Sequence, residues 1–257
     1  IAALDAAAAG KTTLHLAAER AIPTPASERE MLAGDAASAL LVGPGAGIAR
    51  LITSHSVTQD FVDHFREAGE DANYDWEARW VRDEGFGKIA VPALKDALAK
   101  AGIEGSKVSC FIAPISVRGV PDMLAKQAGI PAEAIADVLG ASIGHAGAAH
   151  PTLMLAAALE TAKAGDIICL IAFGQGCDVL LFEVTGAAAH RPRLGVSGWL
   201  ARRSESANYM KYLFHRGLVP LEKGARAEHD SKTALTAMWR NRKAVMALVG
   251  GRCTKTG

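Results

Sequence analysis

The sequence has little of what would stabilise a chain through covalent links or large rings. Aromatic residues make up only 5% of its 257 residues, and none of its four cysteines belongs to a CxxC pair. A chain of this length can bury a full hydrophobic core without disulfides. The scattered cysteines therefore predict reduced thiols in a cytoplasmic compartment, with Cys110 and Cys169 buried in apolar, strand-like runs.

An excess of charge and a long apolar run are missing too. The 28 Lys and Arg residues balance 27 Asp and Glu residues, so neither a nucleic-acid partner nor a solvating acidic tail is indicated. No apolar run approaches the ~20 residues that span a bilayer, and no basic segment precedes the first residues as in a signal peptide. We expect no membrane association. The chain runs from Ile1, without a methionine, to Gly257, and we expect both ends to be cut from a longer protein.

Strand-like and helix-like segments alternate through most of the chain. Such alternation predicts a layered α/β fold. After Thr185 the sequence becomes basic and poor in strand signals, so a soft boundary is expected there. Strands are predicted at 12–18, 36–42, 48–56, 108–114, 166–173 and 179–184, and helices at 1–9, 27–32, 87–101, 120–128, 131–139 and 148–164.

Residues 60–82 interrupt this alternation with acidic and aromatic residues, among them Phe65, Tyr74 and Trp76. This composition is typical of a surface excursion that caps a site. It is equally typical of an irregular connection held down by its aromatic rings.

The glycine-rich segment 144–151 is the most informative for chemistry. Gly144 and Gly147 precede a predicted helix, where backbone N–H groups are free to point at a bound group. His145 and His150 flank small residues, and a neutral imidazole can donate or accept a proton near pH 7. The alternative is a tight entry into the helix with His150 buried at its start.

A second glycine pair, Gly174 and Gly176, lies between two apolar strands and is followed by Cys177. Glycines here would let the backbone approach a ligand, or would simply form a hairpin turn. Cys177 is a possible nucleophile, but no neighbour in the sequence would lower its pKa, so packing is the favoured interpretation.

Several segments together resemble the thiolase superfamily, in particular hydroxymethylglutaryl-CoA synthase and ketoacyl-ACP synthase III. Residues 30–43 resemble the strand with a GDGA motif, with Ala36 in place of the second glycine. Residues 54–61 resemble the segment before the cap of the hydroxymethylglutaryl-CoA synthases. Residues 144–160 and 173–177 resemble the C-terminal half of the superfamily fold.

The resemblance implies a duplicated α/β/α/β/α fold with an incomplete first half, a complete second half and usually a homodimer. It implies Claisen-type acyl transfer through a cysteine thioester, with coenzyme A or acyl carrier protein as the acyl carrier. From the residues present, we expect no metal. Residues 1–9 resemble the remainder of the helix that carries this cysteine, so the nucleophile is expected upstream of Ile1. By the same resemblance, His145 and His150 are the candidate catalytic residues, and Gly144, Gly147, Gly174 and Gly176 shape the thioester site.

Two departures from the family pattern bear on the reaction. His145 stands where ketoacyl synthase III has an asparagine, and an imidazole can also donate to an oxyanion. The family histidine normally follows the strand matched by 108–113, but here Pro114, Ile115 and Ser116 follow it. A degradative thiolase is therefore an open alternative to a synthase.

The tail adds a second resemblance, to the linker into an OB-fold domain with a rubredoxin-like zinc ribbon. Cys253 would be the first zinc ligand, but Thr256 stands where the second cysteine is needed, so no zinc is expected. The expected domains are 1–60, the end of the first thiolase-like half; 61–185, the cap and second half; and 186–257, a basic linker.

The sequence suggests three functions, the last of them only weakly. The first is an acyl-CoA acyltransferase that forms or cleaves a carbon–carbon bond; Arg191 to Arg203 would then meet the coenzyme A phosphates or form a solvated basic face. The second is a non-catalytic scaffold for an acyl-CoA-binding partner domain. The third, a nucleotide-binding α/β protein, is disfavoured because no phosphate-loop motif occurs.

Overall fold

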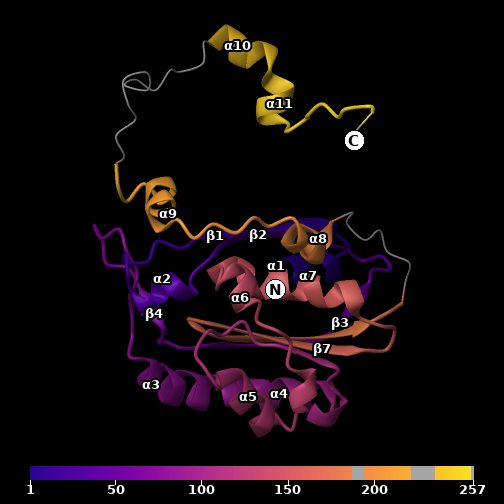
Figure 1. Ribbon diagram of the computed structural model, residues 1–257. Helices are drawn as coiled ribbons and strands as arrows, with labels where there is room; N and C mark the ends of the chain where they lie inside the picture. Colours follow the sequence, from indigo (N-terminus) through magenta and orange to yellow (C-terminus); the bar gives the residue numbers. More distant parts are fainter. Residues whose placement is uncertain (187–193, 221–234, 256–257) are drawn as a thin grey trace. The chain divides into compact units, whose positions relative to one another are not determined.

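The computed structural model describes residues 1–186, 194–220 and 235–255 (Figure 1). The chain forms two compact units, Ile1–Glu205 and Ser206–Gly257. Within these ranges, no helix is both long and apolar enough to cross a membrane. Arg191 and Arg193, which the sequence places in a basic face, lie outside the described residues.

A four-stranded mixed sheet forms the centre of the first unit. The strand order is β3-β8-β7-β6, in which β6 and β7 are parallel and the other neighbours are antiparallel. Its inner strands are almost continuously apolar because both faces of the sheet are covered. The strands are β3 (Ala49–Thr58), β6 (Cys110–Ile112), β7 (Ile167–Gly174) and β8 (Gly176–Val184).

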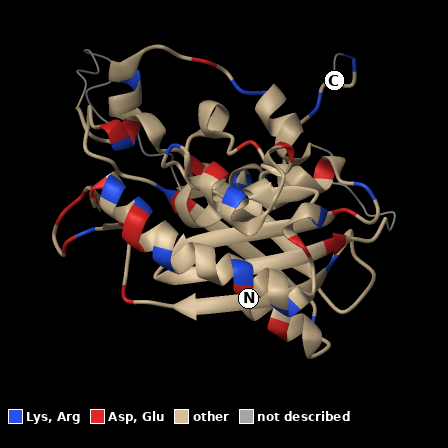
Figure 2. Cartoon of the chain, turned by 90° about the horizontal axis from the view of Figure 1, so that it is seen from below, with Lys and Arg blue, Asp and Glu red and all other residues tan. Residues whose placement is uncertain are grey.

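Helices on one face of the sheet carry the larger hydrophobic core (Figure 1). The helix α4 (Val91–Ala101) contacts β3 and β8, and α5 (Val120–Ala128) packs against α4. Leu94 and Leu124 of these helices are fully buried with Phe111 of β6. Figure 2 views this side: charged residues lie on the helices and loops, whereas the strands behind them carry few.

The other face is covered by α7 (His150–Thr161), which lies between two sheets. It contacts β6 and β7 on one side and β2 (Asp35–Val42) on the other. The strands β1 (Thr13–Arg20) and β2 form an antiparallel ribbon, and α1 (Ala2–Ala8) contacts both. The described part of the first unit is therefore layered α/β/α/β.

Most predicted elements are present within a few residues, but two predictions were wrong. The predicted helix at 131–139 is only the short 3-10 turn η3 (Ala132–Ala134), because Ile135 then forms a bridge to Phe111 beside β6. The helix predicted to begin at residue 87 begins at Ala78, as α3 (Ala78–Trp80), and continues through the wide-turned η1 (Val81–Ala90) into α4.

Residues 60–77 form an extended connection held by aromatic rings. The two-residue strands β4 (His64–Phe65) and β5 (Tyr74–Asp75) pair with each other. The Phe65 ring lies 5.3 Å from that of Tyr74 and 5.9 Å from that of Trp76, measured between ring centroids. This favours the interpretation of a connection fixed by its aromatic residues. Next to it, α2 (Glu28–Leu32) is capped by Ser27, whose side chain accepts the Glu30 N–H.

The remaining described residues are helical. In the first unit, α8 (Gly195–Ala201) contacts α7. The second unit contains α9 (Tyr209–Arg216), α10 (Leu235–Arg240) and α11 (Arg242–Met246). The division between the units falls at Glu205, later in the chain than the change of composition near Thr185. The assignment to two thiolase-like halves and a linker stays a prediction.

Candidate functional site

A cavity of about 450 Å³ in the first unit is lined by the candidate catalytic residues. Its walls come from the segment that follows β6, from the start of α5, from residues 135–140 and from the glycine-rich segment before α7. Both histidines singled out by the sequence lie on its wall. The lining residues are Leu32, Ile115, Ser116, Val117, Arg118, Gly119, Pro121, Asp122, Ile135, Ala136, Asp137, Val138, Gly140, His145 and His150.

His145 is partly buried and has both ring nitrogens in hydrogen bonds. Its Nδ1 accepts the N–H of Gly147 at 3.3 Å, and its Nε2 lies 2.9 Å from the carbonyl oxygen of Pro114. A carbonyl oxygen can only accept, so Nε2 carries the ring proton. The ring is thus a neutral N–H donor whose acceptor is a backbone carbonyl next to the cavity.

His150 is almost fully buried, with 1% of its surface exposed. Its Nδ1 accepts the N–H of Ala146 at 3.1 Å, and its Nε2 donates to the carbonyl oxygen of Val138 at 2.8 Å. The ring stacks on that of His145, with 4.8 Å between centroids. Burial and the neighbouring His145 lower the pKa of His150 to about 4. His150 therefore stays neutral at pH 7.

The His145 backbone is fixed by a short parallel bridge to residues 32–34. The His145 N–H donates to Leu32 and its carbonyl accepts from Gly34. The two backbones approach so closely that a Cβ on Gly34 would overlap the carbonyl of Ile143. A Cβ on Gly144, whose φ is +70°, would lie 2.6 Å from the carbonyl oxygen of Ala33. Both glycines are thus required by backbone packing.

The N–H groups that precede α7 are already bonded within the chain. The N–H of Ala148 donates to a carboxylate oxygen of Glu19, on β1, at 2.6 Å. The carboxylate lies against Gly147, where a Cβ would overlap it. At this turn the N–H of Ala148 is therefore bonded to a side chain of the protein itself, and the prediction that Gly144 and Gly147 bind a ligand stays a prediction.

Gly174 and Gly176 form the tip of the β7–β8 hairpin, where they face each other. Gly176 has φ +108°, and a Cβ there would overlap the carbonyl of Val57 on β3. The parallel strands β6 and β7 have their C-terminal ends at the same edge of the sheet. The hairpin tip follows β7 at this edge, and Pro114 follows β6 there. The site and the hairpin therefore share one edge of the sheet.

The three cysteines of the first unit are not activated. Burial raises the pKa of Cys110, Cys169 and Cys177, in the last case to about 12. Their thiols are protonated at pH 7 and poor nucleophiles. In the second unit Cys253 is exposed, and Thr256 lies outside the described residues. No group of three or more His, Cys, Asp or Glu side chains in the described ranges could hold a metal ion.

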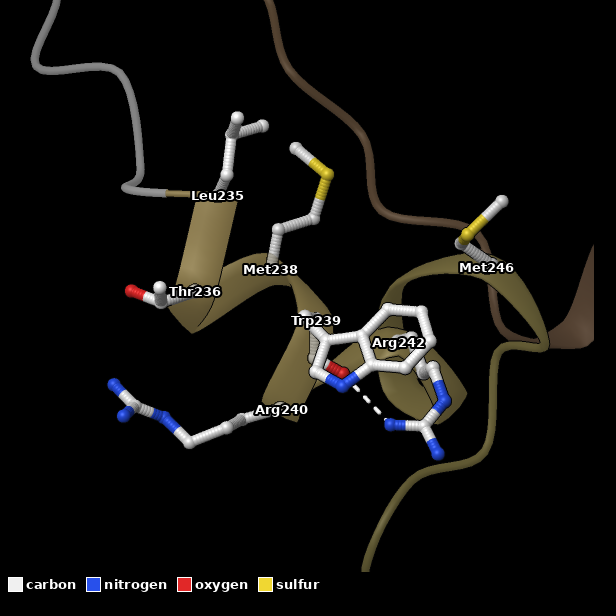
Figure 3. Close-up of a pocket in the computed structure, with 7 residues that line it drawn as sticks. All are labelled: Leu235, Thr236, Met238, Trp239, Arg240, Arg242 and Met246. Atoms are coloured by element: carbon white, nitrogen blue, oxygen red, sulfur yellow. Dashed lines mark hydrogen bonds between the residues drawn. The ribbon is translucent and has the colours of Figure 1, made fainter.

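The second unit has a more open cavity of about 560 Å³, between α10 and α11 (Figure 3). Its wall is apolar, and the Arg242 guanidinium lies over the Trp239 ring at 4.3 Å and donates to the Trp239 carbonyl. Its described lining contains no His, Cys, Asp, Glu or Lys side chain, so we place the candidate site in the first unit.

Two residues of the site were missed from the sequence. Arg118 lies on the cavity wall in a solvent-exposed turn, and Glu19 reaches the glycine-rich segment from a strand more than a hundred residues earlier. The contact of Glu19 depends on the pairing of distant elements and has no local signal. Arg118, three residues beyond Ile115, could have been found by asking which charges follow the end of β6.

Comparison with known proteins supports the architecture. A family model described as 3-oxoacyl-[acyl-carrier-protein] synthase III C terminal matches residues 98–180. A hydroxymethylglutaryl-CoA synthase from Pyrobaculum arsenaticum is 26% identical over 202 residues, which are 77% of this chain and 58% of that protein.

Two solved structures extend the comparison. The 3-oxoacyl-(acyl carrier protein) synthase III of Pseudomonas aeruginosa matches with a TM-score of 0.59 at 18% identity, over 71% of this chain and 61% of the other. An HMG-CoA synthase complexed with CoA matches with a TM-score of 0.58 at 18% identity, over 75% of this chain and 54% of the other. The chain spans less than two thirds of the length of each of these relatives. The predicted thiolase-like α/β fold is confirmed.

Proposed function

We propose that this chain is part of an acyl-CoA acyltransferase that forms or cleaves a carbon–carbon bond next to a thioester. The observation that carries the proposal is the neutral imidazole of His145, whose proton lies on Nε2 at the wall of a cavity. The similarity to synthases that handle acyl carrier protein and coenzyme A substrates supports the substrate class.

His145 is proposed to donate its Nε2 proton in a hydrogen bond to the thioester oxygen as negative charge develops there. A neutral N–H donor held in place before the reaction stabilises an oxyanion without reorganisation. The ring would exchange the Pro114 carbonyl for the substrate oxygen as its acceptor. Asparagine, the residue that ketoacyl synthase III has at this position, is also a neutral N–H donor.

His150 is proposed to support His145 rather than to exchange protons itself. Both of its nitrogens are bonded to backbone groups, and because its pKa is about 4 the ring is not protonated to imidazolium at pH 7 and cannot act as a general acid. Its ring stacks against the His145 ring and supports it. The two histidines, both expected from the sequence as candidate catalytic residues, are thus proposed to have different roles.

The nucleophile is proposed to be a cysteine of the parent protein upstream of Ile1. The raised pKa values of Cys110, Cys169 and Cys177 make them unsuitable for attack on a thioester. Arg118, exposed beside the cavity, is proposed to pair with a phosphate of coenzyme A. A cytoplasmic location, a homodimer and an OB-fold zinc-ribbon partner also belong to this proposal.

The non-catalytic scaffold is the second candidate, and one observation favours it. After the strand where the resemblance leads us to expect a histidine, the chain has Pro114, Ile115 and Ser116, and none of them carries an imidazole that could transfer a proton. A thiolase-like subunit without acid–base chemistry would hold an acyl-CoA-binding partner domain instead of reacting.

Intact-protein mass spectrometry of the full-length parent, after incubation with a panel of acyl-CoAs, separates the two candidates. The enzyme gains the mass of one acyl group, and replacement of the upstream cysteine abolishes the gain. A folded protein that binds coenzyme A but gains no mass from any thioester would contradict the enzyme and favour the scaffold.

A further inference from the structure

We propose that Glu19 is a positioning residue that holds the His145 ring in place through the turn at residues 146–148. Only its kinetic consequence rests on the proposed function. Glu19 does not line the cavity; its carboxylate contacts the turn from the β1–β2 ribbon, on the side opposite the sheet. Nothing in the local sequence connects it with the histidine.

A short chain of contacts links the carboxylate to the imidazole. Glu19 accepts the N–H of Ala148 at 2.6 Å and lies against Gly147, which has no side chain to keep it away. The N–H of Gly147 in turn donates to Nδ1 of His145. The carboxylate thus holds the Gly147–Ala148 peptide, and the adjoining Ala146–Gly147 peptide supplies the N–H that holds the ring. The ring presents Nε2–H beside the cavity.

Glu19 lies on a strand that is paired along its whole length. β1 pairs with β2 over its whole length, with Glu19 opposite Ala36. The same ribbon contacts the start of α7 a second time, through Ser38, whose hydroxyl lies 2.5 Å from that of Thr152. Glu19 and Ser38 thus attach the ribbon at two places, to the turn at residues 146–148 and to the first turn of α7.

The turn also shows why a glutamate is suited to this role. Gly147 has φ +47°, a left-handed conformation that would be strained for most residues. This conformation turns the Ala148 N–H outward, and the Glu19 carboxylate accepts a hydrogen bond from it. Without an acceptor here, the turn would be free to relax and to withdraw the Gly147 N–H from the imidazole.

The first test is spectroscopic and does not depend on turnover. We would compare Glu19→Met, which keeps the length of the side chain but lacks a strong acceptor, with Glu19→Gln, which keeps one acceptor oxygen. Two-bond proton–nitrogen spectra of the histidine rings should show the Nδ1 resonance of His145 moving towards that of an unbonded nitrogen in Glu19→Met. In Glu19→Gln it should stay near its wild-type position.

A matched control comes from Glu160, whose carboxylate accepts the N–H groups of Val196 and Ser197 at the start of α8. Glu160→Met removes the same kind of contact elsewhere, so it should leave the His145 resonances unchanged. Identical His145 spectra in wild type and Glu19→Met would overturn the proposal. So would an equal displacement in Glu160→Met.

The second test uses the full-length parent enzyme. Because misplacing a catalytic group by ~1 Å can cost about 100-fold, kcat of Glu19→Met should fall about 10- to 100-fold, with KM for the acyl-CoA changed less than about twofold. Glu19→Gln should recover most of the loss. A rise in KM at unchanged kcat would overturn the positioning role. If the wild type turns over no thioester, the proposed function fails, and the spectra alone still decide whether Glu19 holds His145.

Discussion

Acidification should destabilise the first unit through His150 in particular. The unfolded imidazole takes up a proton as the pH falls through about 6.5, whereas the folded ring, with a pKa of about 4, does not. Between these values the unfolded state binds more protons than the folded state, so the free energy of unfolding decreases as the pH decreases. The stabilisation from the neutral His150 ring is lost by about pH 4. A shift of this size corresponds to roughly 3 kcal/mol, at about 1.4 kcal/mol per pKa unit.

The comparison that isolates this effect is wild type against His150→Gln, which cannot titrate but keeps a donor for the Val138 carbonyl. Urea unfolding followed by circular dichroism at pH 7, 5.5 and 4.5 gives the free energy of each protein. We expect the variant to be less stable at pH 7 and the gap to narrow by roughly 2 kcal/mol at pH 4.5.

Met154→Ala is the control, because it removes buried atoms from the same helix without a titrating group. Its stability gap to wild type should be similar at each pH. If the gap between wild type and His150→Gln were also independent of pH, His150 would not be held neutral by burial. The role assigned to it as an uncharged support would then be wrong.

Three further results are expected. Gly34→Ala should cost ~3 kcal/mol or more in urea unfolding because its Cβ overlaps the Ile143 carbonyl, whereas Gly45→Ala, with open space around it, should cost less than ~1 kcal/mol. Cys177 should resist iodoacetamide at pH 8 in the folded protein and react after unfolding, because burial raises its pKa to about 12; rapid alkylation of the native thiol would contradict this. Arg118→Ala should weaken coenzyme A binding about 10-fold by calorimetry if it pairs with a phosphate, and unchanged affinity would refute the pairing.

The sequence predicted best those elements whose signals are local. The helix at 120–128 has the predicted bounds because Gly119 and Gly129, both with positive φ, mark its two ends. The strands β7 and β8 are apolar runs around a glycine turn, and both were found. Here the residues that set each boundary are neighbours in the sequence.

The failures depend on contacts between distant residues. The proline and alanines at 131–134 are typical of a helix start, yet the chain leaves the helix after one turn because the Ala136 N–H bonds to the Phe111 carbonyl. The early start of the helix before α4 was hidden by charged residues. Its buried side includes Phe86, which packs on Phe173 from a strand predicted separately.

The candidate site was predicted in part for the same reason. His145 and His150 stand out because small residues surround them, so the sequence could single them out. The different roles proposed for them could not be predicted, since the pKa of His150 depends on burial in the folded first unit. Glu19 was missed because its partner lies 129 residues away along the chain.

The most direct test of the proposed chemistry is the thioester turnover of two His145 variants. His145→Asn keeps a neutral N–H donor and should retain kcat within about 10-fold, whereas His145→Ala, which has lost an oxyanion donor, should lose about 100- to 1000-fold. Equal and nearly complete activity in both variants would contradict the assignment of His145 as the oxyanion donor of this site.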